Sequence, residues 1–101
     1  MDLNFQNLST VQSGAQPPPA TVASTTIIAP QTFMTLVSGT IDITTLTPPV
    51  TGSHMLLLIP TNAAPGDLLT TGNVLVGSTT LAQNVPTLLF YNPLNGKYYP
   101  K

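Results

Sequence analysis

The sequence lacks whole classes of side chain. It contains no cysteine, tryptophan, glutamate or arginine, and its charged residues are three aspartates and two lysines. Charged residues make up 5% of the chain, compared with about 25% in an ordinary soluble domain. Without cysteine there is no disulfide, no thiolate nucleophile and no thiolate metal site. The ordinary equipment of many enzymes is therefore missing.

The scarcity of charge also excludes classes of partner. Phosphate binding needs clustered lysine or arginine, whereas this chain has a net charge of -1 and two lysines near one end. The longest unbroken apolar run is Met55 to Ile59, far short of the roughly 20 residues of a membrane-spanning helix. The first residues have neither a basic stretch nor an apolar stretch typical of a secretory signal. We expect neither nucleic acid nor membrane as a partner.

Uncharged polar residues replace charge on the predicted surface. The solvent-exposed surface must therefore consist largely of threonine, serine, asparagine and glutamine. Their hydroxyls and amides cost less to desolvate than ions. A chain of 101 residues forms one domain with a modest core. These two features predict a protein whose surface is covered by other protein, including copies of itself.

Residues 1–20 are expected to form an extended N-terminal arm. Three consecutive prolines fix an extended polyproline conformation and stop any helix. Apolar side chains precede them at spacings that fit neither a regular helix nor a regular strand. A disordered tail is one interpretation, and an arm whose apolar residues dock on a partner protein is the preferred one. The candidate docking residues are Leu3, Phe5, Leu8, Val11, Pro17, Pro18 and Pro19.

Residues 21–101 have the composition of a β domain. Threonine, valine and isoleucine dominate, turn residues recur, and every candidate helix is interrupted. The pattern predicts an all-β fold, a small antiparallel sandwich or barrel of about seven short strands. Residues 54–59 are apolar on both faces, so we expect a central strand covered on both sides. The expected strands are 22–29, 32–37, 40–46, 54–59, 74–76, 79–81, 87–91 and 97–99.

Few side chains could carry chemistry. Asp42 and Asp67 are separated by two predicted loops, and the adjacent Ser53 and His54 would point to opposite faces of a strand. We therefore predict no catalytic residue, no enzyme activity, no cofactor and no metal site. The one alternative for His54, a metal site shared by three copies on a three-fold axis, is less favoured than a structural hydrogen bond.

Aromatic residues gather near the C-terminal end. Phe90 and Tyr91 precede a turn with Asn-Gly near its end, and Tyr98 and Tyr99 follow it, as in a β-hairpin. Cross-strand pairing is their common use. Stacking on a sugar is the alternative, with Tyr91, Tyr98 and Tyr99 as candidate contacts at the exposed end.

Five segments of the chain have a distinctive pattern of threonine, glycine and proline: TFMTLVSGTIDITTLTPP at 32–49, Gly52, LLLIP at 56–60, TTGN at 70–73 and YNPLNGKYYP at 91–100. Together they resemble a β module of tailed-bacteriophage virion proteins, as found in head decoration (cement) proteins, head fibres and tail-fibre tips. The resemblance covers roughly the last seventy residues and leaves the arm outside. It implies a homotrimer on the surface of the particle.

A compact domain with one short arm and no long shaft fits a decoration protein better than a whole fibre. We therefore expect a structural virion protein on the capsid surface that binds the major capsid protein and stabilises the head. The alternatives are a head-fibre or tail-fibre tip for host attachment, with or without glycan binding, and a non-viral adhesive module.

Overall fold

The computed structural model describes residues 18–75 and 80–101, which form an all-β domain. These residues contain no helix, and so none long and apolar enough to cross a membrane. The strands are β1 (Ala20–Ala23), β2 (Ile27–Ile28), β3 (Met34–Ser38), β4 (Thr45–Leu46), β5 (His54–Pro60), β6 (Thr87–Asn92) and β7 (Lys97–Pro100).

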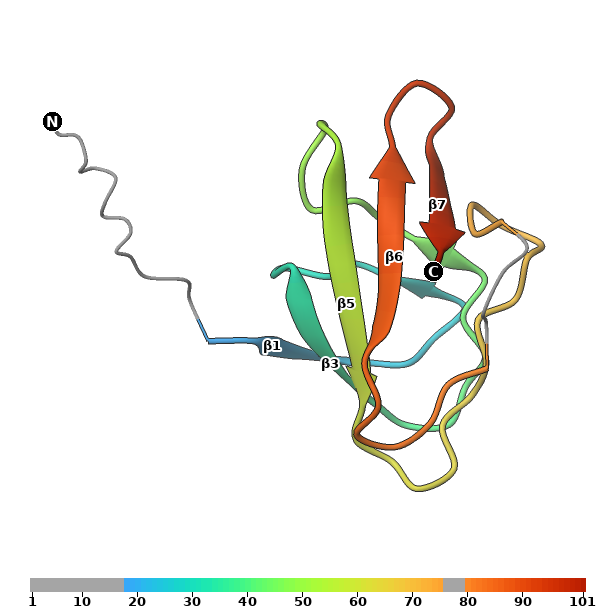
Figure 1. Ribbon diagram of the computed structural model, residues 1–101. Coiled ribbons are helices and arrows are strands. Elements are labelled where there is room, and N and C mark those ends of the chain that lie inside the picture. The colour runs from blue at the N-terminus through green and yellow to red at the C-terminus, as the bar shows by residue number, and fades with distance from the viewer. Residues whose placement is uncertain (1–17, 76–79) are drawn as a thin grey trace, which may run out of the picture.

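A five-stranded sheet in the order β1-β3-β5-β6-β7 dominates the fold (Figure 1). β1, β3 and β5 are parallel, whereas β5, β6 and β7 are antiparallel. β2 and β4 form a second, two-stranded parallel sheet. The expected all-β class and the seven short strands are confirmed, but a purely antiparallel arrangement is wrong and the large sheet is not closed into a barrel.

The parallel pairs arise because the first half of the chain winds between the two sheets. Parallel neighbours need long crossover connections, and here β2 lies in the crossover from β1 to β3 and β4 in that from β3 to β5. An isolated parallel bridge between Ile43 and Leu68 adds a further turn to the second layer. The β6–β7 hairpin then completes the large sheet.

The core lies on the inner face of the large sheet, between it and the crossover segments. Alternate residues of β5 and β6 point inward, so that Leu56, Leu58 and Leu89 are fully buried. Ile43 and Leu46 reach the same core from the second layer. The core cluster is Ile28, Val37, Ile43, Leu46, Leu56, Leu58, Leu68, Val74, Leu81, Leu89 and Tyr98.

A side-chain amide holds part of the second layer in place. Asn73 Oδ1 accepts a hydrogen bond from the Leu46 N–H at 2.9 Å, and Asn73 Nδ2 donates to the Leu46 carbonyl at 2.7 Å. The Asn73 carbonyl accepts from the Tyr98 N–H at 2.8 Å. Asn73 therefore links β4 to β7 in place of a further strand.

Four predicted strands have counterparts in the structure. The prediction for 32–37 corresponds to β3, that for 54–59 to β5, and those for 87–91 and 97–99 to β6 and β7. Gly96, with a φ of 69°, lies in the turn between β6 and β7.

The first half of the chain is more broken than predicted. The expected strand at 22–29 is divided into β1 and β2, and that at 40–46 is reduced to β4 and the bridge at Ile43. Both segments turn a corner between the two sheets, so neither can stay extended. Residue 20 of the expected arm belongs to β1.

Between β5 and β6, Val74 forms an isolated bridge to Tyr98 and no strand. The prediction for 79–81 has no strand at residues 80 and 81. Residues 76 and 79, which these two predictions include, lie outside the described residues.

Candidate functional site

The outer face of the large sheet is apolar as well as the inner one. Strand alternation places Met55 and Leu57 of β5 on this face. Register aligns Met55 with Phe90 of β6 and Tyr99 of β7, and Leu57 with Met34 of β3. Met55 is 57% exposed, Met34 45% and Phe90 40%. In the described chain the outer side of β5 is therefore uncovered, contrary to the expectation of a strand covered on both sides.

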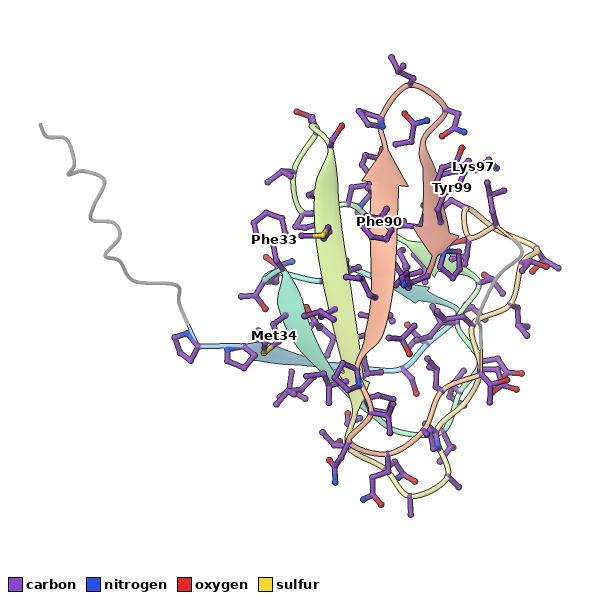
Figure 2. All side chains as sticks on the ribbon, in the orientation of Figure 1. Phe33, Met34, Phe90, Lys97 and Tyr99 are labelled. Atoms are coloured by element: carbon purple, nitrogen blue, oxygen red, sulfur yellow. The ribbon has the colours of Figure 1, made fainter. Side chains whose placement is uncertain are left out.

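Charge is almost absent from this outer sheet face. Among the sheet residues that alternate onto it, Lys97 is the charged one, and it lies next to the β6–β7 turn. Figure 2 shows Met34, Phe90 and Tyr99 spread across the sheet, with Lys97 beside Tyr99. The Tyr99 hydroxyl accepts a hydrogen bond from Asn95 Nδ2 at 2.6 Å. The face combines apolar surface with polar groups near the β6–β7 turn, of which Lys97 carries the charge.

A groove of about 750 Å³ opens at the end of this face where β3 and β5 begin. Volumes of this order are typical of pockets that bind small molecules. Its lining residues are Pro19, Gln31, Thr32, Phe33, Met34, Pro49, Val50, His54, Met55, Leu57 and Leu88. No charged side chain is among them, so the groove suits an apolar occupant.

Threonine hydroxyls fix the segment before β3 that lines one side of the groove. The Thr32 hydroxyl donates to the Met34 carbonyl at 2.6 Å and accepts from the Ala20 N–H at 3.2 Å. The buried Thr35 hydroxyl donates to the Thr32 carbonyl at 2.6 Å. These bonds hold the start of β1 against the start of β3, which places Pro19 at the rim of the groove.

His54 lines the groove and also contacts the buried Tyr98 of the core. Its Nδ1 lies 2.8 Å from the Gly52 carbonyl oxygen and its Nε2 lies 2.8 Å from the Tyr98 hydroxyl. Because a carbonyl only accepts, Nδ1 carries the proton of the neutral ring and Nε2 accepts from Tyr98. The ring stacks on Tyr91 at 4.9 Å and packs against Phe33 at 5.5 Å. The histidine thus joins the β5 strand to the hairpin.

Tyr98 is the electrostatically perturbed group of this cluster. Its side chain is fully buried. Burial raises the pKa of the Tyr98 hydroxyl well above its ordinary value, and the nearby Tyr91 adds to the rise. A buried phenol of this kind stays protonated over the whole physiological range.

The candidate chemical residues have structural roles here. Both His54 nitrogens are in hydrogen bonds, so binding a metal at a three-fold axis would break one of them. Asp42 Oδ1 accepts from the Asp67 N–H at 2.9 Å, so these two aspartates do meet, but through main chain. The described residues contain no cluster of three or more histidine, aspartate or glutamate side chains that could hold a metal ion.

The tyrosines expected at an exposed end do not share a face. Tyr91 and Tyr98 alternate onto the inner side and Tyr99 onto the outer side. Tyr98 is buried, so its expected exposure is wrong. A sugar could reach Tyr91 or Tyr99, but these two rings cannot form one stacking platform within a single copy.

Of the expected docking residues, Pro18 and Pro19 are described, and both are exposed. Leu3, Phe5, Leu8, Val11 and Pro17 lie outside the described residues. The outer sheet face was missed by sequence reasoning, although the two-sided apolar pattern of 54–59 was its signal. The groove had no such signal, because its lining comes from five separate segments.

Comparisons with protein families, with curated proteins and with solved structures found no match to this chain.

Proposed function

We propose that this chain is a structural virion protein of a tailed bacteriophage, a homotrimeric decoration protein that attaches to the outer surface of the capsid and stabilises the head. It acts by covering protein surface and not by catalysis. Its partners are copies of itself and the major capsid protein.

The observation that carries the proposal is the apolar, nearly uncharged outer sheet face with its groove. Met34, Met55 and Phe90 are exposed side by side across neighbouring strands. Large contiguous apolar patches on soluble proteins mark sites of interaction with other protein or with membranes. Apolar cores with polar rims are also the usual anatomy of protein–protein interfaces.

The role of the polar groups supports a structural function over an enzymatic one. Asp42 supports the loop at Asp67, and His54 bridges Gly52 and Tyr98. General acid–base catalysis requires groups that face a substrate, whereas these groups face other parts of the same chain. The resemblance of the last seventy residues to phage virion modules adds the particle as the expected location.

Attachment at a fibre tip is the alternative, and copy number separates the two. Quantitative mass spectrometry of purified heads and tails of the phage that encodes the chain tests the proposal. A decoration protein is expected on heads, in a copy number comparable with that of the major capsid protein. A few copies confined to tails, or absence from particles, would contradict capsid decoration.

A further inference from the structure

We propose that the groove at the start of β3 and β5 receives the N-terminal arm, residues 3–11, of a neighbouring copy, so that arms and grooves link the subunits of the oligomer. This inference rests on the homotrimer of the proposed function, and it names the contact that holds the copies together.

The chemistry of the groove matches the arm. The groove exposes Phe33, Met34 and Val50 and has no charged lining residue. The arm carries Phe5 and Leu8 among uncharged polar residues. Binding therefore buries apolar side chains without stranding a charge, and the polar arm residues can remain at the rim.

The position of the arm relative to the groove is the second argument. Pro19 lines the groove, and the Ala20 N–H is bound to Thr32 at its wall. The arm therefore begins at the rim of a groove on its own subunit. In a ring of identical copies, each arm begins beside a groove at every interface. If each arm enters the groove of the next copy, the contacts run head to tail around a closed ring.

The stiffness of the arm favours a neighbour over the same copy. Pro17, Pro18 and Pro19 are expected to form an extended rod of about 9 Å, since polyproline rises about 3.1 Å per residue. In Figure 1, β1 enters the sheet from outside the body of the domain, and Pro18 and Pro19 are exposed. An arm that continues this line moves away from its own groove and would have to reverse direction to return to it.

The arm is also long enough to reach. At about 3.3 Å per extended residue, the chain from Phe5 to Pro19 spans up to about 46 Å, comparable with the longest dimension of the domain, 44 Å. This reach is enough for Phe5 and Leu8 to enter the groove of a copy that contacts the domain.

Cysteine cross-linking tests the contact cleanly because the chain has no cysteine of its own. A Leu8→Cys chain is co-expressed with a Val50→Cys chain that carries a mass tag, and the purified mixture is oxidised mildly. We expect a disulfide-linked pair of one tagged and one untagged chain. The control replaces Val50→Cys by Leu94→Cys. Leu94 is more exposed (94%) but is not among the residues that line the groove, so this pair should give at least tenfold less product.

The double variant Leu8→Cys/Val50→Cys distinguishes the copies. Disulfides between chains support the inference, whereas disulfides only within single chains, or no preference for residue 50 over residue 94, would overturn it. Analytical ultracentrifugation gives a second measurement. Phe5→Ser should raise the concentration at which the oligomer dissociates at least tenfold, whereas the neighbouring Asn4→Ser should leave it unchanged. Equal behaviour of the two variants would also overturn the inference.

These results are separable from the fate of the proposed function. Exchange of arms between isolated chains that are absent from virions would leave this inference standing and contradict capsid decoration. Presence on heads together with cross-links only within single chains would support capsid decoration and contradict this inference.

Discussion

Replacing Asn73 by alanine removes the side-chain hydrogen bonds that link β4 to the segment beside β7. Both amide atoms of Asn73 bond the main chain of Leu46, at 2.9 and 2.7 Å, and Leu46 is 0% exposed. Truncation leaves one N–H and one C=O without a partner, and each such buried group costs about 1–3 kcal/mol. Because Asn73 is half-buried, water can enter part of the space, so we expect a loss of about 2–4 kcal/mol.

Urea unfolding followed by far-UV circular dichroism measures this loss as a change in the free energy of unfolding. Asn62→Ala is the matched control, because the Asn62 side chain accepts from the Ala64 N–H only in an exposed turn, and we expect a loss below about 1 kcal/mol. Asn73→Asp should resemble Asn73→Ala, since a carboxylate cannot donate to the Leu46 carbonyl. Equal stability of Asn73→Ala and Asn62→Ala would refute the reasoning.

Three other predictions concern packing, pH and attachment. A methyl group at Gly66 would collide with the main chain of Ile41, so Gly66→Ala should lower the melting temperature through a loss of about 1–3 kcal/mol, whereas Gly52→Ala, with open space around it, should change it little. Burial raises the pKa of Tyr98, so its contribution to stability is complete below the unfolded pKa of about 10 and is lost as pH rises above it. Tyr98→Phe should therefore flatten the alkaline decline in the free energy of unfolding. An unchanged slope of that free energy against pH would count against the raised pKa of Tyr98. Decorated particles washed in salt of about 1 M, where the screening length is about 3 Å, should keep the protein, and release by salt alone would contradict an apolar attachment.

The hairpin could be predicted from sequence because its signals are local. Asn95 and Gly96 mark the turn, and the flanking apolar segments pair as expected in β6 and β7. The apolar run of β5 likewise predicted a central strand, and β5 lies between β3 and β6. Turn chemistry and hydrophobic pattern act over a few residues, so a single sequence carries them.

The parallel winding could not be predicted because its spacing is irregular. Register pairs Ala20 with Thr35 but Met34 with Leu57, so successive turns differ in length and no internal repeat appears in the sequence. Parallel pairing depends on contacts between residues far apart in the chain, and short extended segments do not specify their partners. The antiparallel prediction was therefore wrong about which strands pair, and not about which segments form strands.

The candidate site was predictable only in part. Charge scarcity indicated a surface to be covered, and the structure concentrates apolar side chains on the outer face at Met55 and Phe90. The aromatic residues were treated as one group because they are close in sequence. Strand alternation separates Tyr98 from Tyr99, burying the first and exposing the second.

The most direct test of the account is attachment of a chain whose outer sheet face carries a charge. Phe90→Asp places a carboxylate on that face, whereas Leu94→Asp places the same charge on the exposed turn beside it. Burying an unpaired carboxylate costs several kcal/mol, and each 1.4 kcal/mol is a tenfold change in affinity. With both variants shown to be folded, binding to undecorated particles should fall at least tenfold for Phe90→Asp and stay near the unmodified level for Leu94→Asp. Equal binding of the two variants would contradict attachment through this face.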